Sequence, residues 1–256
     1  MKISIVTACY NSASTIRDTL RTIQMQTHKN IEHIIIDGGS TDGTLEILEK
    51  NRHHIAHLTS EPDNGLYDAM NRGVSKATGE IIGLLNSDDL LANEHVLSSV
   101  ANTLADSEID ACYGDLVYVK QDDISQVVRY WHSKSYNPAL IARGWIPAHP
   151  TFYARREVHD RYGMLFNLDY KLASDYELLL RLLVTHKINV AYIPEVMVKM
   201  RLGGTTNKSL KNIINQNKEI MRALKSHRHD FSPLKMLCSK IINRLQQYQK
   251  RAEYVE

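Results

Sequence analysis

The fold is decided by residues 81–89, whose sequence is Ile-Ile-Gly-Leu-Leu-Asn-Ser-Asp-Asp. The apolar first half predicts a buried strand, which stops abruptly at an amide, a hydroxyl and two adjacent carboxylates. Neighbouring carboxylates repel each other unless a positive charge lies between them, so Asp88 and Asp89 are candidate ligands of a hard divalent cation. The alternative is a polar turn in which Asp89 caps a helix that begins near Glu94.

The chain around this stretch alternates strands with helices. We expect strands at residues 2–9, 31–37, 55–60 and 81–85, and helices at residues 14–25, 44–50, 67–77 and 94–105. Such alternation predicts an α/β fold, in which a parallel sheet carries helices on both faces. Polar turns at Thr7, Asp37, Glu61 and Asp88 then lie at one edge of the sheet, where open α/β sheets bind nucleotide-sized ligands.

Composition predicts a globular protein. The 256 residues suffice for one large α/β domain with an appendage, and 43% hydrophobic residues supply its core. Three widely separated cysteines form no CxxC pair, which argues against a disulfide framework or a zinc site. The first strand follows Met1 and Lys2 directly, so we expect no signal peptide, no membrane span and a cytoplasmic location.

Charge divides the chain into two parts. Residues 208–256 carry 11 lysines and arginines against 4 acidic residues, a net charge of +7, whereas residues 1–207 carry −5. We therefore expect a domain at residues 1–207 and a basic helical C-terminal extension at residues 208–256. Its two helices are expected at residues 210–226 and 232–247.

The second of these helices has an apolar stripe with cations beside it. The stripe is formed by Leu234, Leu237, Ile241 and Leu245, and the flanking cations are Lys235, Lys240 and Arg244. Two alternatives stay open. The helix docks on the domain, or it contacts an anionic membrane or a lipid-linked diphosphate.

Four motifs in register carry a family resemblance. They are Ser-Ile-Val-Thr-Ala-Cys-Tyr-Asn at 4–11, Ile-Ile-Ile-Asp-Gly-Gly-Ser-Thr-Asp-Gly-Thr at 34–44, Ser-Glu-Pro-Asp-Asn-Gly at 60–65 and Leu-Asn-Ser-Asp-Asp at 85–89. Over about residues 1–205 the chain resembles a family 2 glycosyltransferase of the GT-A fold, most of all the small bacterial enzymes of capsule, O-antigen and colanic-acid assembly. The resemblance implies a Rossmann-like, mainly parallel mixed sheet flanked by helices.

The resemblance also implies an activity. It is that of a nonprocessive, inverting hexosyl- or N-acetylhexosaminyltransferase, which moves one sugar from a nucleotide-sugar donor, with a UDP-sugar favoured. The implied acceptor is a saccharide or an undecaprenyl-diphosphate-linked saccharide of surface polysaccharide biosynthesis. The Gln-x-x-Arg-Trp signature of processive relatives is absent from the sequence. With its basic tail, such an enzyme would work at the inner face of the plasma membrane, without nucleic acid.

On the donor side, the resemblance assigns binding roles to Thr7, Tyr10, Asp37, Asp88 and Arg201. Asp37 corresponds to the carboxylate that accepts a hydrogen bond from the base, which suits the imide N–H of uracil or thymine and the equivalent edge of guanine. The alternative for Asp37 is a tight turn in which Ser40 or Thr41 caps the next helix. For Arg201, the alternatives are closure over the diphosphate and a plain turn at 203–207.

The resemblance implies a metal site at Asp88 and Asp89. A bound Mn²⁺ or Mg²⁺ would neutralise the charge that develops on the departing nucleoside diphosphate. Asn86 departs from the pattern because many relatives carry Asp there, which leaves open which of the two carboxylates ligates directly. Met70 also departs, since many relatives place an Arg there facing the nucleotide.

Asp175 is the candidate general base. It lies in Leu-Ala-Ser-Asp-Tyr-Glu at 172–177, where Ser174 and Glu177 have the spacing of a capping box. An acid in a first helical turn favours the helix dipole and requires no catalysis, which is the alternative. The segment resembles the family's Glu-Asp motif, with Ser174 replacing Glu, and its Asp removes a proton from the acceptor hydroxyl.

The acceptor side is expected at residues 145–151. Trp145 would offer an apolar face to a sugar and His149 a hydrogen-bond donor, and the alternative is a rigid Pro-bounded loop with a buried Trp. Asp115, inside an expected strand at 111–119 that pairs with one at 126–131, either meets donor hydroxyls or is satisfied at the strand end. A further strand is expected at 196–201.

Other classes of protein fit parts of this pattern. A nucleotidyltransferase would show a Gly-rich basic loop after the first strand, and a NAD-binding enzyme would show GxGxxG there, whereas this chain has Tyr-Asn-Ser-Ala at 10–13. A noncatalytic nucleotide-sugar-binding or scaffold protein of the same fold is the alternative left open by Asn86, Met70 and Ser174. The intact Asp88, Asp89 and Asp175 argue against it.

Overall fold

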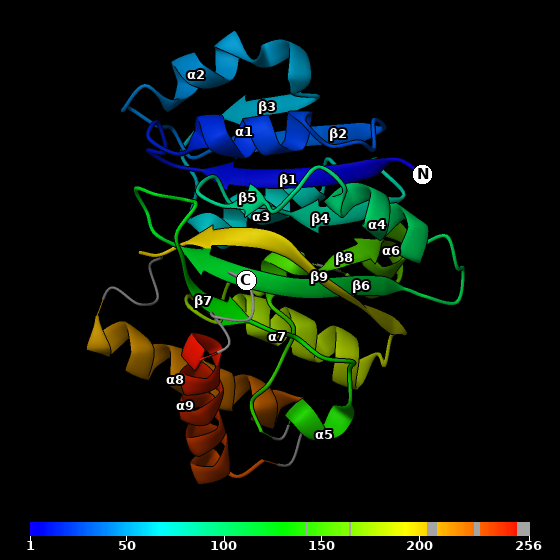
Figure 1. Cartoon of the computed structure of the whole chain (residues 1–256), viewed down its shortest axis with the longest axis vertical. Helices are drawn as coiled ribbons and strands as arrows, with labels where there is room; N and C mark the ends of the chain where they lie inside the picture. The colour runs from blue at the N-terminus through cyan, green and yellow to red at the C-terminus, as the bar shows by residue number, and fades with distance from the viewer. Residues whose placement is uncertain (142, 164, 204–208, 228–230, 250–256) are drawn as a thin grey trace.

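The structure is a computed structural model, and it describes residues 1–141, 143–163, 165–203, 209–227 and 231–249. Its centre is a nine-stranded mixed, mainly parallel sheet in the order β3-β2-β1-β4-β8-β6-β9-β5, with β7 paired to β6 (Figure 1). The strands are β1 Ile3–Cys9, β2 Ile31–Asp37, β3 His57–Ser60, β4 Ile81–Leu84, β5 Leu90–Leu91, β6 Ala111–Val119, β7 Val127–Trp131, β8 Tyr153–Arg155 and β9 Val190–Arg201. The predicted α/β class is confirmed.

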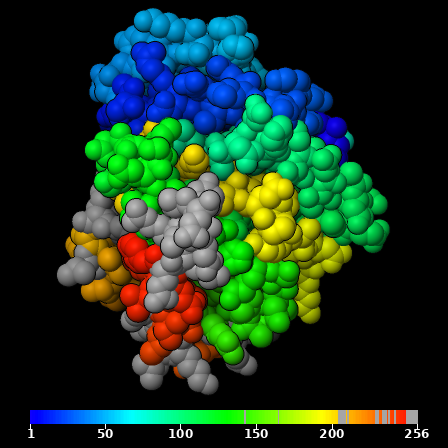
Figure 2. Space-filling view, viewed as in Figure 1, coloured from blue at the N-terminus to red at the C-terminus, as the bar shows by residue number. Residues whose placement is uncertain are grey.

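Helices cover both faces of this sheet. They are α1 Ile16–Gln24, α2 Thr44–Lys50, α3 Leu66–Val74, α4 Val96–Thr103, α5 Pro138–Ile141, α6 Arg156–Tyr162, α7 Ser174–Leu180, α8 Leu210–Ser226 and α9 Pro233–Gln249, with short helical turns at Arg52–His54, His149–Thr151 and Arg181–Thr185. Helices α5, α8 and α9 gather at the end of the molecule opposite α2, and Figure 2 shows α9, in red, beside the green surface of the middle of the chain. Among the described residues, no helix is both long and apolar enough to cross a membrane.

The parallel half of the sheet fixes the ligand-binding edge. Every residue of β1 is buried, including the polar Ser4 and Thr7, as in a parallel strand covered on both faces. Cys9 pairs with Asp37, Asp37 pairs with Ser60, and Val6 pairs with Leu84, so the strands end side by side. The predicted placement of the polar turns at one edge is therefore confirmed.

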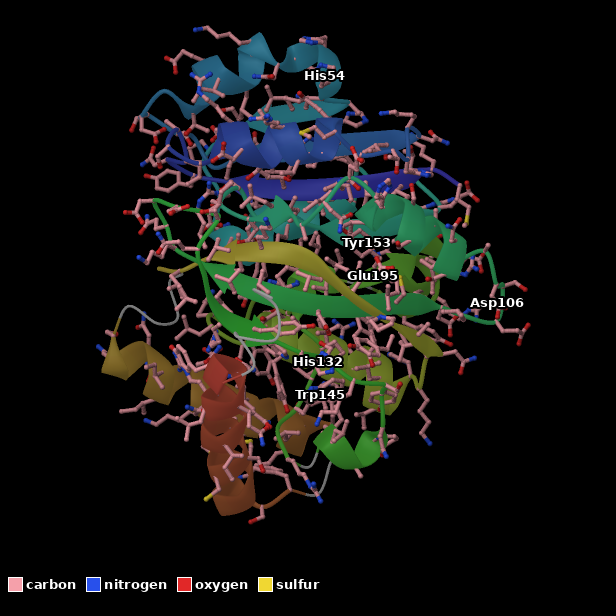
Figure 3. The ribbon with its side chains drawn as sticks, viewed as in Figure 1. His54, Asp106, His132, Trp145, Tyr153 and Glu195 are labelled. Atoms are coloured by element: carbon pink, nitrogen blue, oxygen red, sulfur yellow. The ribbon has the colours of Figure 1, made fainter. Side chains whose placement is uncertain are left out.

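The antiparallel strand β8 depends on one glycine. A Cβ on Gly83 would lie 2.3 Å from Cε1 of Tyr153, whose ring is fully buried across the β4–β8 pair (Figure 3). The sequence analysis missed this three-residue strand. It also placed the start of β9 six residues too late, because β9 begins at Val190 and pairs in parallel with β6.

The carboxylate of Glu32, on β2, makes the stability of the fold depend on pH in the acid range. Burial alone would raise the pKa of Glu32, but hydrogen bonds from Lys2, Ser4 and Thr78 lower it to about 2, against 4.5 for the free group. A lowered folded-state pKa gives stability that is present above pH 4.5 and is lost as the pH falls towards 2.

We therefore expect Glu32→Gln to remove about 3 kcal/mol of unfolding free energy at pH 7. The difference from wild type should shrink steadily between pH 5 and pH 2. Urea unfolding at a series of pH values measures it, and a difference that stays constant with pH would contradict the assignment.

Helix α7 is capped differently from the prediction. Ser174 is already inside the helix, and its hydroxyl donates to the carbonyl of Asn167 at 2.8 Å instead of capping. The carboxylate of Glu219, from α8, accepts hydrogen bonds from the backbone N–H groups of Lys171, Leu172 and Ala173 at 3.1, 2.8 and 2.9 Å. The predicted capping box is therefore wrong, and a carboxylate remote in sequence instead holds the three residues that lead into the helix.

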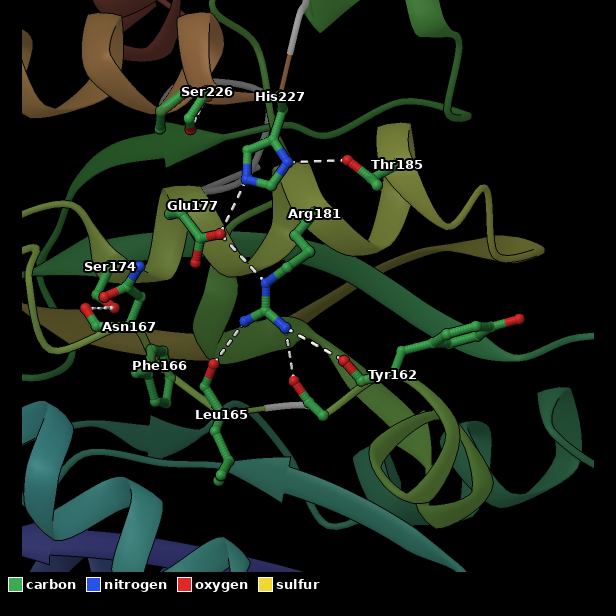
Figure 4. A network of polar contacts seen from close by, with 12 residues as sticks. Tyr162, Leu165, Phe166, Asn167, Ser174, Glu177, Arg181, Thr185, Ser226 and His227 are labelled. Atoms are coloured by element: carbon green, nitrogen blue, oxygen red, sulfur yellow. Dashed lines mark hydrogen bonds and ion pairs between the residues drawn. The ribbon is translucent and has the colours of Figure 1, made fainter.

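A second contact locks α8 to α7 (Figure 4). Glu177, which is 4% exposed, accepts hydrogen bonds from Arg181 at 3.1 Å and from His227 at 2.9 Å. Arg181 also donates to the carbonyls of Gly163 and Leu165, each at 2.6 Å. This guanidinium thus holds the segment before α7 against the helix.

We expect Arg181→Met to lower the free energy of unfolding by about 3 kcal/mol, because Glu177 loses its cation inside the protein. Equilibrium urea unfolding measures the change. The matched control is Arg161→Met, an exposed arginine on α6, which should change stability by less than about 0.5 kcal/mol. Equal effects of the two substitutions would contradict the structural role of Arg181.

The C-terminal helix docks through a residue outside the predicted stripe. Met236 is fully buried, and a Cβ on Gly144 would lie 2.6 Å from its Cγ. Leu245, placed in the apolar stripe, is 61% exposed, and the side chains of the other stripe residues, Leu234, Leu237 and Ile241, lie outside the described ones. The predicted boundary between residues 207 and 208 lies outside the described residues.

Candidate active site

The acidic motif forms a tight turn after β4. Asp89 is fully buried, and its Oδ2 accepts a hydrogen bond from the Asn86 amide at 2.9 Å, while its Oδ1 has no hydrogen-bond partner among the residues that the structure describes. Burial and the adjacent Asp88 raise the pKa of Asp89 well above its ordinary value, although Asn86 and Arg201 act in the opposite direction. Asp88 is only partly buried, so it is the carboxylate that reaches the surface.

These residues fit a divalent cation. Two adjacent carboxylates and an unpartnered buried carboxylate oxygen are what a hard cation with oxygen ligands compensates. Within the described part of the chain, no cluster of three or more His, Cys, Asp or Glu side chains completes a protein-only cage. A site with few protein ligands is typical of Mg²⁺ or Mn²⁺ that is shared with a bound diphosphate.

Arg201 lies beneath this turn. Its guanidinium is 5% exposed, donates to the carbonyl of Asp88 at 2.8 Å and forms an ion pair with Asp18. It therefore shapes the acidic turn from below, which differs from the predicted closure over a diphosphate. The turn expected at residues 203–207 lies outside the described residues from 204 onward.

A groove opens beside the acidic turn. Its volume is about 710 Å³, and Asp18, Gln121 and Arg201 are among the residues that line it. A cavity of this volume lies within the range that small-molecule ligands occupy.

Asp37 ends β2 at the same edge. Its side chain is fully buried, and its oxygens accept hydrogen bonds from the Ser40 N–H at 3.0 Å and the Ser60 hydroxyl at 2.6 Å, with further contacts from the Ser40 hydroxyl and Cys9. Burial would raise the pKa of Asp37, but these donors lower it. In this structure Asp37 therefore builds the tight turn that the sequence left as an alternative. The cap of α2 is Gly43, not Ser40 or Thr41.

The two donor-side residues on β1 differ in accessibility. The Thr7 hydroxyl is fully buried and lies 3.0 Å from Nε2 of His33, so its side chain faces the sheet and not the edge. Tyr10 is 64% exposed at the end of the strand. Of the two, only Tyr10 has an exposed side chain, and the contact of Thr7 with the nucleotide stays a prediction.

Asp175 is held in a polar triad. Its Oδ2 lies 2.9 Å from Nδ1 of His149, and its Oδ1 accepts a hydrogen bond from the Tyr67 hydroxyl at 3.2 Å. Burial would raise its pKa, but His149 and the hydrogen bonds lower it below 3.8. The carboxylate is therefore ionised at neutral pH, and with 24% of its side chain exposed it can accept a proton from a bound molecule.

Trp145 belongs to the core. It is 7% exposed and packs edge-on against Tyr113 with ring centres 6.2 Å apart (Figure 3), so the predicted stacking face is covered. Asp115 accepts hydrogen bonds from the Tyr192 hydroxyl at 2.8 Å and the Ser133 N–H at 2.7 Å, and it pairs with His132 at 2.9 Å. Trp145 is thus the buried tryptophan of a structural loop, and the hydrogen bonds of Asp115 are satisfied within the protein, as the structural alternatives predicted.

Tyr67 was not predicted as a residue of this site, and Lys240 was named only as a cation beside the apolar stripe. Tyr67 lies 108 positions before Asp175. Lys240, from α9, lies near enough to Asp175 for the two charges to act on each other. No local signal marks either residue, because both reach the site only through tertiary packing.

The fold is that of the GT-A class. S. aureus TarS in complex with UDP-GlcNAc superposes with a TM-score of 0.69 at 18% identity, covering 98% of this chain and 72% of that one. The mannosyltransferase PcManGT from Pyrobaculum calidifontis, in complex with GDP-Man and Mn²⁺, gives a TM-score of 0.64 at 19% identity, with 98% and 73% coverage.

Sequence comparison gives the family. A model of glycosyl transferase family 2 matches residues 4–166, and the chain belongs to this family. An uncharacterized glycosyltransferase of Mycobacterium tuberculosis is 29% identical over 184 residues, which cover 70% of this chain and 68% of that protein. A PGL/p-HBAD biosynthesis glycosyltransferase of Mycobacterium bovis is 29% identical over 209 residues, with 80% and 78% coverage. The protein is accordingly a glycosyltransferase.

Proposed function

We propose that this enzyme is a nonprocessive, inverting, metal-dependent hexosyl- or N-acetylhexosaminyltransferase. It moves one sugar from a nucleotide-sugar donor, with a UDP-sugar favoured, to a saccharide or lipid-linked saccharide of surface polysaccharide biosynthesis. The observation that carries the proposal is the ionised, partly exposed Asp175 held between His149 and Tyr67. Such a carboxylate is suited to take a proton from an acceptor hydroxyl.

On the donor side, Asp88 and Asp89 would hold Mn²⁺ or Mg²⁺, with Asp88 as the direct ligand and Asp89 as its buried partner. When bound, the cation neutralises charge on the departing diphosphate. Tyr10 is exposed for stacking on the base, and Asp37 shapes the turn that borders it. The complexes of the structural neighbours with UDP-GlcNAc, and with GDP-Man and Mn²⁺, support a nucleotide-sugar donor.

In the proposed reaction, the acceptor hydroxyl attacks the anomeric carbon on the face opposite the diphosphate. Asp175 accepts the hydroxyl proton, and His149 and Tyr67 hold the carboxylate in place. A diphosphate leaves without protonation, so one protein carboxylate suffices, whereas a glycosidase needs two. Attack from the opposite face inverts the anomeric configuration.

The C-terminal extension would bring the enzyme to the inner face of the plasma membrane. Its net charge of +7 favours an anionic surface, where each cation adds on the order of 1 kcal/mol of binding. Sedimentation with anionic liposomes tests this part of the proposal. Equal pelleting with neutral and anionic liposomes would exclude an electrostatic contact.

A panel of UDP-, GDP- and dTDP-sugars tests the activity. Thermal shift with and without Mn²⁺ should identify one donor that raises the melting temperature in a metal-dependent way, and slow hydrolysis of the same donor should follow. A noncatalytic nucleotide-sugar-binding protein would show the thermal shift without hydrolysis or transfer. If no nucleotide sugar shifts the melting temperature, the proposal fails.

A further inference from the structure

Strand β7 carries a buried cation that no acid compensates within the part of the chain that the structure describes. The guanidinium of Arg129 lies 3.6 Å from the centre of the Tyr118 ring, and the residue is 7% exposed. Its Nε has no hydrogen-bond partner, and no ion pair to it occurs among the described residues. A buried charge without a counter-ion is costly, so an arginine in this state is suited to receive an anion from outside the protein.

Helix α9 brings a second guanidinium to the same place. It packs against β7, and Arg244 lies on its exposed side. Burial lowers the pKa of Arg129, and the like charge of Arg244 lowers it further, although the Tyr118 hydroxyl acts in the opposite direction. Two guanidiniums are thus held together with no acid of the described residues paired to Arg129, which is an arrangement that a phosphate group bridges.

Lys240 extends this cationic face by one helical turn. Residues four apart lie on the same side of a helix, so Lys240 and Arg244 are neighbours. The ammonium of Lys240 donates to Asn217 at 2.8 Å, and its stem packs against Gly144 beside Trp145. Burial lowers its pKa to about 8, against the opposing effect of the Asp175 carboxylate.

The cationic face, formed by Arg129, Arg244 and Lys240, therefore lies between Asp175 and the acidic turn that contains Asp89. Lys240 lies within electrostatic reach of Asp175, the proposed base, and Tyr118 lies within reach of both Asp89 and Arg244. The donor diphosphate would be neutralised by the cation that Asp88 and Asp89 are proposed to hold. An anion at the cationic face is thus better placed to belong to the molecule that approaches Asp175.

We propose that Arg129, Arg244 and Lys240 form a binding site for a phosphate or diphosphate group of the acceptor. This inference rests on the proposed glycosyl transfer, and it names the acceptor class as one that carries a phosphate close to the hydroxyl that receives the sugar. A lipid-linked saccharide joined through a diphosphate has this chemistry.

Calorimetric titration with inorganic pyrophosphate in metal-free buffer tests the site. Arg244→Gln is expected to weaken pyrophosphate binding about tenfold or more, since it removes a charge-assisted contact. The charge-matched control Arg161→Gln, on α6, should bind like wild type. Arg244→Gln should also melt at the wild-type temperature or above it, because it removes repulsion from Arg129, so lost binding cannot come from unfolding.

A second titration with UDP and Mn²⁺ separates the two sources of phosphate. Arg244→Gln should bind UDP with Mn²⁺ as wild type does, and an equal loss there would assign the arginines to the donor and overturn the acceptor site. Pyrophosphate binding that is unchanged in Arg244→Gln would also overturn it. If wild type binds pyrophosphate through Arg244 but binds no nucleotide, the proposed function fails while the anion site stands.

Discussion

Asp175→Asn is expected to reduce kcat for sugar transfer about a thousandfold while leaving the affinity for the nucleotide sugar unchanged. An amide of the same shape keeps the contacts to His149 and Tyr67 but cannot accept the hydroxyl proton, and general-base catalysis is commonly worth a factor of this order. Donor affinity by thermal shift and transfer by single-turnover kinetics measure the two effects separately.

Tyr67→Phe is the matched control, because it removes one hydrogen bond to Asp175 and keeps the carboxylate. Its expected loss is about tenfold. Since hydrogen bonds lower the pKa of Asp175, wild type should keep its activity as the pH falls from 7 to 5, and the acid limb of Tyr67→Phe should move upward. Retention of full activity by Asp175→Asn would remove Asp175 from the reaction.

Asp88→Asn is expected to weaken Mn²⁺-dependent donor binding more than a hundredfold. Asp88 is the carboxylate of the pair that reaches the surface, and a ligand to a cation on a diphosphate is worth several kcal/mol. Titration with UDP at fixed Mn²⁺ measures the loss, and titration with UDP in EDTA should show wild type and Asp88→Asn binding equally weakly.

Asp89→Asn is the companion variant. Burial and Asp88 raise the pKa of Asp89 and so oppose its ionised form, and an amide should therefore cost less there than at Asp88. If Asp89→Asn loses metal-dependent binding and Asp88→Asn does not, the direct ligand is Asp89 and the assignment of roles is reversed.

The elements that sequence patterns predicted well are those whose signal is local. Strands β2 and β6 and helices α2 and α8 have the predicted bounds, because each is a continuous apolar run or an amphipathic repeat between clear breaks. Strand β8 was missed because three residues carry no period, and it forms only through its pairing with β4 and β6.

Only those parts of the site that lie in sequence motifs could be predicted. The edge, the acidic turn and Asp175 follow from spacing and family resemblance, whereas the burial of Trp145 and the saturated hydrogen bonding of Asp37 depend on neighbours distant in sequence. For the same reason, Arg129 was not predicted to be a site residue. Its missing counter-ion is visible only once α9 lies against β7.

The Glu219 carboxylate has a consequence for synthesis on the ribosome. The helix that presents Asp175 begins at Ser174, but the carboxylate that holds the three N–H groups just before it arrives only with residue 219, 46 positions after Ala173. A nascent chain that has exposed the whole sheet therefore still lacks the clamp that sets the start of this helix. Catalytic competence would come late in translation, when α8 has left the exit tunnel and closed on α7.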